Sequence, residues 1–252
     1  MYNEVNMTRR TLVGISLVAM LVMVLLLLVK EAAAPSAPKV TAPTKSAPRT
    51  TQPKATTFDK TQFSTTDPSS PWVVVNKQHP LSPIDYTPND LMPVGNGQQM
   101  RAEAATALKT MFSDAQAGGY TLVADSGYRS YSTQVSTYNS EVKAYGQAKA
   151  DSESARPGYS EHQTGWAVDI GADGCHVADC FGDLPAGQWV QANSYKYGFI
   201  WRYTSDNTDV TGYRAEAWHF RYIGAALAAE MHKEGITTLE QFFNISGGPN
   251  YN

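Results

Sequence analysis

Two consecutive segments near the start of the chain are unsuited to a globular core, so any such core must lie after them. The stretch Thr11–Val29 is apolar and uncharged, and Arg9 and Arg10 stand directly before it. Residues 30–71 are rich in Ala, Pro, Thr, Ser and Lys and contain few large apolar side chains, which is too little apolar surface to fold. The sequence therefore predicts one domain of ordinary size over residues 72–252.

The apolar stretch predicts an uncleaved transmembrane anchor. A helix over residues 11–29 would span roughly 28 Å, close to the thickness of the bilayer core. The arginine pair predicts that residues 1–10 are cytoplasmic and that everything after Lys30 lies outside, with residues 30–71 as a disordered linker. A cleaved signal peptide is the alternative, because three consecutive alanines, 32–34, offer a small-residue cleavage site.

The charge of the predicted domain argues against nucleic acid as a partner. The whole chain carries 20 basic and 23 acidic residues. Of these, 8 basic and 4 acidic residues fall within 1–71, which leaves 12 and 19, or a net charge of -7, in residues 72–252. Because phosphate contacts need clustered Lys and Arg, we expect no nucleic-acid binding. We expect the chain to be a monomer.

The spacing of apolar residues predicts a mixed α+β fold, in which helices flank a small mixed or antiparallel sheet. Apolar residues recur every three or four positions from Met100 to Ala115 and predict a helix over 96–119. The other expected helices are 132–148, 186–197, 224–233 and 238–243, and the expected strands are 120–124, 166–170, 199–203 and 217–223. Since helices and strands do not alternate regularly, a doubly wound parallel sheet is not expected.

The two cysteines of the chain, Cys175 and Cys180, lie close together in a Gly- and Asp-containing stretch, Gly171–Asp183, that is typical of a loop. In an oxidising compartment such a pair predicts a local disulfide, and the expected export favours it. In a reducing compartment the pair would be two thiols. A zinc site built from this pair alone is not expected, because four ligands are needed.

Two other segments contain residue types that bind a catalytic metal. His162 precedes Asp169 by seven residues, with a Gly turn and the start of a strand between them. In residues 216–222, aromatic side chains alternate with polar ones, so His219 lies on the strand face opposite the aromatics. Either His alone is more often structural. Together, two His and one Asp supply the three protein ligands of a catalytic zinc, and Glu216 is placed to act as a base.

Three blocks of this sequence resemble those of the D-alanyl-D-alanine carboxypeptidases of the vancomycin-resistance (VanY-like) type. They are S-A-R-P-G-Y-S-E-H-Q-T-G at residues 154–165, S-G-Y-R-S at 126–130 and E-A-W-H at 216–219. The likeness extends over roughly residues 72–243. In that family, S-x-H-x-x-G-x-A-x-D supplies the first His and the Asp ligand, and E-x-W-H supplies the base and the second His. The resemblance therefore implies a zinc D,D-peptidase (hedgehog-like) fold, with ligands His162, Asp169 and His219 and the base Glu216.

The resemblance implies a zinc-dependent carboxypeptidase, with one Zn²⁺, that removes the terminal D-alanine from peptidoglycan stem peptides. The predicted anchor would place it on the wall side of a bacterial cell membrane. Cleavage of the D,D type is preferred and L,D cleavage is possible. Zinc can lower the pKa of its water to about 7, and Glu216 would take the water proton and later give it to the departing amine. A peptidoglycan endopeptidase and a non-catalytic wall-binding domain with a structural zinc stay open as alternatives.

The resemblance also places Arg129 at the substrate, where a guanidinium can hold a carboxylate or stabilise an oxyanion. Gln134 and Ser160 are further candidates for substrate contacts. One departure is Ala217, where members of the family commonly have Pro. The loop Gly171–Asp183 has no role that the family assigns.

Overall fold

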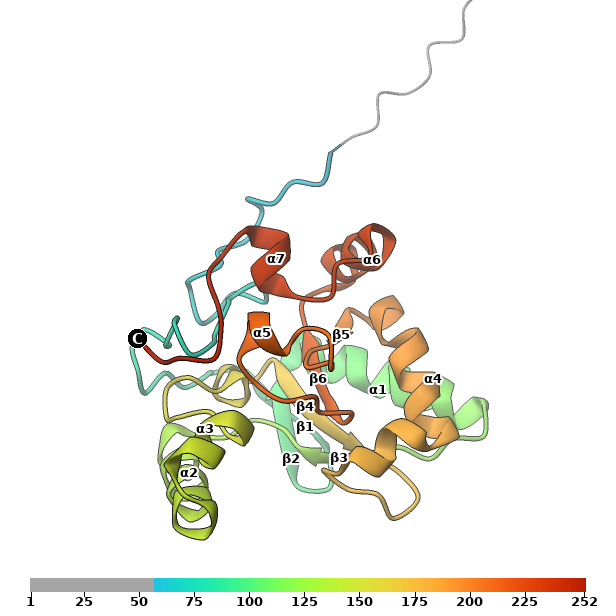
Figure 1. Cartoon of the computed structure of the whole chain (residues 1–252). Helices are drawn as coiled ribbons and strands as arrows, with labels where there is room; N and C mark the ends of the chain where they lie inside the picture. The colour runs from blue at the N-terminus through green and yellow to red at the C-terminus, as the bar shows by residue number, and fades with distance from the viewer. Residues whose placement is uncertain (1–56) are drawn as a thin grey trace, which may run out of the picture. The chain divides into compact units, whose positions relative to one another are not determined.

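A four-stranded sheet forms the centre of the domain (Figure 1). It carries two of the residues expected to bind metal, Asp169 and His219. The computed structural model describes residues 57–252. The strands of this sheet are β3 (Val123–Ser126), β4 (Ala167–Gly171), β5 (Phe199–Trp201) and β6 (His219–Tyr222). They lie in the order β3-β4-β6-β5, and each neighbouring pair is antiparallel. A separate antiparallel hairpin joins β1 (Leu91–Gly95) to β2 (Gln98–Arg101).

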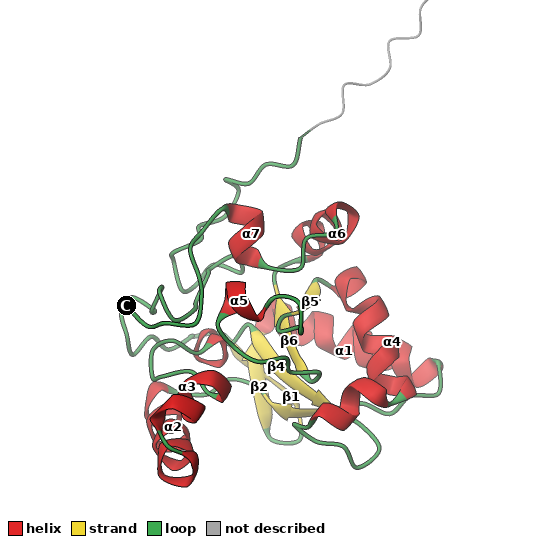
Figure 2. Cartoon of the chain, in the orientation of Figure 1, coloured by secondary structure: helices red, strands yellow, loops and turns green. Residues whose placement is uncertain are grey.

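Helices pack around the sheet. The α-helices are α1 (Ala102–Ala117), α2 (Tyr131–Tyr145), α3 (Gln147–Glu153), α4 (Pro185–Asn193), α5 (Thr208–Thr211), α6 (Ala225–Glu234) and α7 (Leu239–Phe243). Three short 3-10 helices are η1 (Glu161–Thr164), η2 (Asp179–Asp183) and η3 (Ser194–Tyr197). Helices α1 and α4 contact each other on one side of the sheet in Figure 2, and α2 and α3 contact each other on the other side. The predicted mixed α+β fold with a small antiparallel sheet is confirmed.

The core forms between the sheet and α1. Phe220 of β6 and Val168 of β4 are fully buried and pair directly across the two strands. Leu108 and Met111 of α1, which the helical spacing had placed on one face, are also fully buried in the same cluster. Apolar packing therefore holds β4 and β6 in register.

Backbone conformations with positive φ explain two differences from the predicted elements. The expected helix 96–119 begins only at residue 102, because Asn96 and Gly97, with φ of 50° and 72°, form the turn of the β1–β2 hairpin. An Asn-Gly pair suits this turn, since both residues tolerate the left-handed region. The expected helix 132–148 is divided into α2 and α3 at Gly146, whose φ is 84°.

The prediction of a membrane-bound protein needs correction. Within residues 57–252, no helix is both long enough and apolar enough to cross a bilayer. The longest helix there, α1, has 16 residues and carries charged side chains on the face away from the core. The stretch 11–29, on which the anchor was predicted, lies outside the described residues.

The described structure begins before the predicted boundary at residue 72. Phe58 packs against Trp72 with ring centroids 5.7 Å apart, and the Lys60 ammonium donates a hydrogen bond to the Phe242 carbonyl at 2.8 Å. Residues 57–71 thus belong to the packed domain.

A disulfide joins Cys175 to Cys180 in the loop that follows β4. A hydrogen bond and an ion pair connect this loop to other parts of the domain: Nδ1 of His176 lies 2.8 Å from Asp125 of β3, and Asp179 lies 3.2 Å from Arg214. The loop Gly171–Asp183, to which the family resemblance gave no role, is therefore held both to β3 and to the segment that precedes β6.

Replacing Phe220 by Ala should lower the free energy of unfolding by about 3–5 kcal/mol, because the substitution leaves a cavity in the core between the sheet and α1. Phe63 is 45% exposed and contacts Trp72 at one edge, so Phe63→Ala is the matched control and should cost about 1 kcal/mol or less. Urea unfolding of the full chain measures both values. Equal losses in the two variants would contradict this description of the core.

Candidate active site

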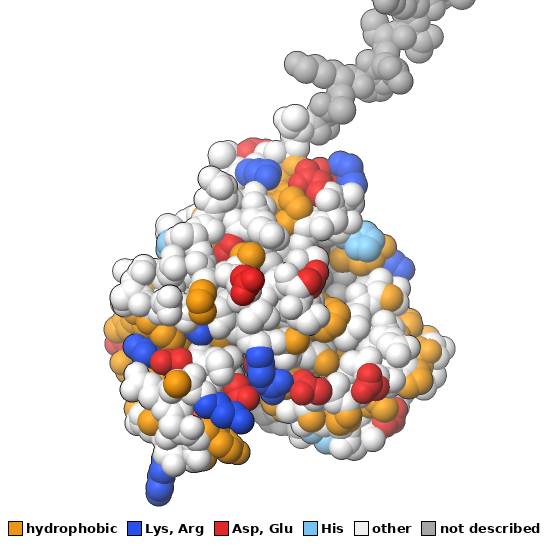
Figure 3. Space-filling model, in the orientation of Figure 1, with side chains coloured by type: hydrophobic (Ala, Val, Ile, Leu, Met, Phe, Trp, Pro, Cys, Tyr) orange, Lys and Arg blue, Asp and Glu red, His pale blue; other side chains and the backbone are white. Residues whose placement is uncertain are grey.

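The residues expected to bind metal and substrate line one cleft. It is bordered by α2, α3 and η1, by β4 and β6, and by the segment that precedes β6. The side chains that line it include Arg129, Gln134, Ser160, His162, Asp169, Tyr203, Tyr213, Arg214, Glu216, Trp218 and His219. On the face of the molecule drawn in Figure 3, basic and acidic side chains lie next to one another, without a broad field of one sign.

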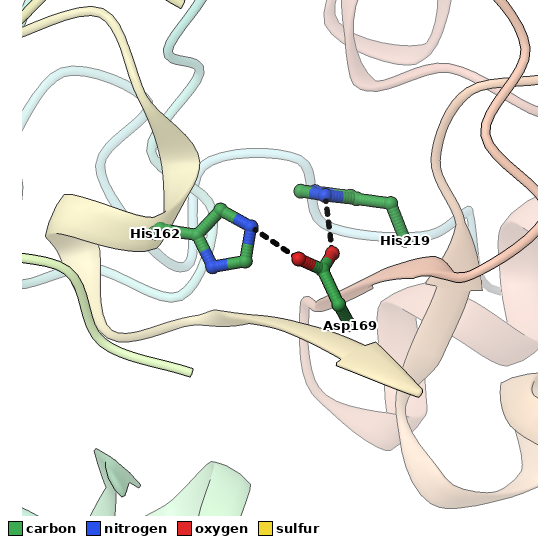
Figure 4. Close-up of side chains that lie close together, drawn as sticks. All are labelled: His162, Asp169 and His219. Atoms are coloured by element: carbon green, nitrogen blue, oxygen red, sulfur yellow. Dashed lines mark ion pairs between the residues drawn. The ribbon is translucent and has the colours of Figure 1, made fainter. Parts of the chain in front are cut away.

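Three buried side chains converge at the base of the cleft (Figure 4). Nε2 of His162 lies 3.4 Å from one carboxylate oxygen of Asp169, and Nδ1 of His219 lies 3.2 Å from the other. One potential ligand atom from each residue lies within 4.8 Å of the other two. The register of the sheet creates this arrangement, because Asp169 of β4 is paired with His219 of β6. His162 is brought to them by η1.

A backbone carbonyl orients His162. Its Nδ1 lies 2.7 Å from the Gly127 carbonyl oxygen, so Nδ1 carries the proton and Nε2 faces Asp169 with its lone pair. Gly127 itself passes so close to Gln99 that a side chain at this position would collide with the Gln99 carbonyl. This close approach explains the glycine of the Ser-Gly-Tyr-Arg-Ser segment.

The three side chains fit a zinc ion. Zinc prefers imidazole nitrogens and carboxylate oxygens, and catalytic sites use three protein ligands. Oδ1 of Asp169 is buried and, among the described residues, has no hydrogen-bond partner. Since buried polar atoms are nearly always satisfied, a cation between the two histidines would complete its surroundings.

The carboxyl group of Glu216 lies beside this cluster. Its Oε2 is 3.6 Å from Nδ1 of His219. Burial raises the pKa of Glu216 to about 7, although the neighbouring His219 opposes the shift. The indole N–H of Trp201 donates to the Glu216 carbonyl at 2.7 Å and holds the backbone that carries this side chain. A carboxyl group with such a pKa is suited to exchange protons near neutral pH.

The metal-binding candidates have shifted pKa values of their own. Burial alone would raise the pKa of Asp169, but the adjacent His162 and His219 outweigh it and hold the pKa below its ordinary range. Burial lowers the pKa of His162. For His219, burial is outweighed by the adjacent carboxylates of Asp169 and Glu161, which raise its pKa to about 9. The ionised carboxylate of Asp169 is the form that binds a metal.

Arg129 enters the cleft from the loop after β3, and two side chains hold it. Its guanidinium donates to Oε1 of Gln134 at 3.0 Å and to Oγ of Ser126 at 2.9 Å. Gln134 is 1% exposed, and its amide donates to the Ala155 carbonyl at 2.7 Å. The amide of Gln134 is therefore already engaged in supporting Arg129. Ser160 lines the cleft directly before η1 and is 4% exposed.

Sequence reasoning missed a set of buried charges behind His219. Glu161, which directly precedes His162, forms salt bridges with Arg202 and Arg221. Arg202 forms a further salt bridge with Glu240 of α7. Glu161 lies inside one motif, and Arg221 lies two residues after His219. These positions could have suggested the contact between Glu161 and Arg221. Arg202 and Glu240 belong to no motif, and only the fold brings them together.

Comparison with known proteins gives one family and several close relatives. A family model described as VanY, D-alanyl-D-alanine carboxypeptidase, matches residues 97–225. The protein YodJ of Bacillus subtilis is 43% identical over 188 residues, which cover 70% of this chain and 68% of YodJ.

Solved structures agree with the sequence comparison. The LdcB LD-carboxypeptidase superposes with a TM-score of 0.65 at 42% identity, over 71% of this chain and 88% of LdcB. A mutant of the vancomycin-resistance D,D-pentapeptidase VanY in complex with Zn(II) superposes with a TM-score of 0.62 at 34% identity, over 70% of this chain and 99% of that one.

The cluster predicts that the purified chain retains zinc and that His219→Ala loses it on dialysis, because only two of the three ligands remain. His232 is exposed on α6 and stacks on Tyr195, away from the cleft, so His232→Ala is the matched control and should retain zinc. Elemental analysis of both variants measures this. Full zinc content in His219→Ala would show that the metal lies elsewhere.

Proposed function

The chain belongs to the VanY family of D-alanyl-D-alanine carboxypeptidases, and on this basis we propose that it is a zinc-dependent carboxypeptidase that releases the terminal D-alanine of peptidoglycan stem peptides. The observation that carries the proposal is the convergence of His162, Asp169 and His219 beside Glu216 at the base of one cleft. All four residues lie within the part of the chain that matches the family.

The cluster can hold one zinc ion per chain, with His162, Asp169 and His219 as protein ligands. When bound, zinc supplies a Lewis acid for the scissile carbonyl and allows water to act as the nucleophile near neutral pH. Because one chain supplies three metal ligands and the proposed base, we propose that a monomer suffices for catalysis.

Glu216 serves as the proton carrier. It does not belong to the set of three converging ligands, yet its carboxyl oxygen lies 3.6 Å from the nitrogen of one of them. With a pKa raised to about 7 by burial, Glu216 can take a proton from the attacking water and then deliver it to the departing amine.

Arg129 is the group proposed to recognise the substrate's terminal carboxylate. A guanidinium has five N–H donors, and two of those of Arg129 are used by Gln134 and Ser126. The remaining donors are available at the cleft, where a planar guanidinium can bind a carboxylate with two parallel hydrogen bonds. Stabilisation of an oxyanion is the alternative role. Gln134 then acts mainly by fixing Arg129, and Ser160 stays a candidate for a substrate contact.

Replacing Glu216 by Gln should reduce turnover by a factor of about 10² to 10⁴ and leave zinc content unchanged, because Gln keeps the shape but cannot take up a proton. Release of D-alanine from a stem peptide by the full chain, together with elemental analysis, measures both properties. Glu234→Gln, at the exposed end of α6, is the control and should match the native rate. A native rate in Glu216→Gln would refute the proposed mechanism, and loss of zinc would place Glu216 among the ligands.

The likeness to the LdcB LD-carboxypeptidase favours L,D cleavage of tetrapeptides as a second candidate specificity. We therefore expect release of D-alanine from stem peptides that end in five residues, in four residues, or in both. Incubation of the full chain with each muropeptide, followed by mass analysis of the products, identifies the bond. Cleavage within the stem without release of D-alanine would instead indicate an endopeptidase.

A further inference from the structure

A buried carboxylate contacts the Nε2 edge of the His219 ring, opposite the nitrogen that faces Asp169. We propose that Glu161 is a positioning residue that fixes the proton of His219 on Nε2, so that Nδ1 is the atom offered to the metal. The inference rests on the proposed function, because it takes His219 as a ligand. It adds a residue that touches neither metal nor substrate and acts through His219.

The contacts of Glu161 divide its two oxygens between different partners. Oε1 accepts hydrogen bonds from Nε of Arg202 at 2.8 Å and from one terminal nitrogen of Arg221 at 3.0 Å. Oε2 lies 3.3 Å from Nε2 of His219. An ionised carboxylate can only accept hydrogen bonds, so Nε2 of His219 must donate. In the neutral ring that metal binding requires, the lone pair is then on Nδ1, the nitrogen that faces Asp169 and Glu216.

Glu161 is itself held in place from behind. The two terminal nitrogens of Arg202 donate hydrogen bonds to the carboxylate of Glu240 in α7, at 2.9 and 2.7 Å. Arg221 donates to the carbonyl oxygens of Pro71 and Val73, both at 2.9 Å. The side chains of Glu161 and of both arginines have no exposed surface, so no rotation of Glu161 can exchange these partners for water. Two carboxylates and two guanidiniums also cancel in charge, so the group contains no uncompensated buried charge.

The two candidate ligand histidines therefore offer different ring nitrogens to the metal. The acceptor behind His162 is the Gly127 carbonyl at Nδ1, which leaves Nε2 for the metal. The acceptor behind His219 is the Glu161 carboxylate at Nε2, which leaves Nδ1. A hydrogen bond on the far nitrogen sets the tautomer and ring orientation of a ligand histidine, and a carboxylate there also raises its basicity.

Glu161→Gln tests the inference because it inverts the hydrogen bond. The two arginines can only donate, so they retain the single amide oxygen, and the amide N–H₂ then faces Nε2 of His219. This arrangement favours the tautomer with the proton on Nδ1, which blocks metal binding. Glu240→Gln is the matched control, since it removes the same charge from the same network but leaves Glu161 in contact with His219.

We expect Glu161→Gln to weaken zinc binding by about 10- to 100-fold, the range typical when a partner behind a metal ligand is lost. Glu240→Gln should bind zinc nearly as tightly as the native chain, although its melting temperature falls. Chelator competition on the full-length folded variants measures the zinc affinity. Native affinity in Glu161→Gln, or an equal loss in Glu240→Gln, would overturn the inference.

The native protein provides a second test that does not depend on either variant folding. In the zinc-loaded full chain, the ¹⁵N chemical shifts of the His219 ring should show Nδ1 bound to metal and Nε2 protonated. Coordination through Nε2 would overturn the inference while leaving the proposed function intact. A His219 ring that binds no zinc would overturn the ligand set of the proposed function, and this inference with it.

Discussion

The antiparallel register between β4 and β6 is the constraint on which the site depends. It pairs Asp169 with His219, and the next pair along the same two strands is Val168 with Phe220, both fully buried. Because side chains alternate between the two faces of a strand, a slip of one strand by one residue would break up both the apolar pair and the polar pair. Packing of the hydrophobic core thus positions the metal-binding side chains.

The three carboxyl groups around His219 have different surroundings, and their pKa values differ accordingly. Asp169 is held ionised by two histidines, whereas burial leaves Glu216 with a pKa of about 7. Glu161 is also ionised, since the attraction of Arg202 and Arg221 outweighs the effect of burial and lowers its pKa. The three environments suit a ligand, a proton carrier and a hydrogen-bond acceptor, respectively. Such separation of proton affinities among neighbouring carboxyl groups is a common property of hydrolytic sites.

The sequence predicted which residues of the candidate site lie together better than it predicted the ends of the helices and strands. His162, Asp169, His219 and Glu216 belong to local motifs, so their grouping could be proposed before the fold was known, and the mixed α+β class followed from the irregular order of apolar patterns. The hairpin at Asn96 was missed because its residues continue the apolar spacing of the helix that follows. The partners of Glu161 were missed for a different reason: they lie far apart along the chain, and only tertiary packing brings them together.

The buried charges behind His219 define how much of the chain the site requires. The family match covers residues 97–225, yet the carbonyl groups that receive Arg221 belong to Pro71 and Val73, and the carboxylate that receives Arg202 belongs to Glu240. A fragment cut at the limits of the match would contain every motif and would still leave two guanidinium groups short of their partners in an apolar interior. The catalytic motifs are therefore not a transferable module, and the smallest self-sufficient unit of this protein extends beyond them in both directions.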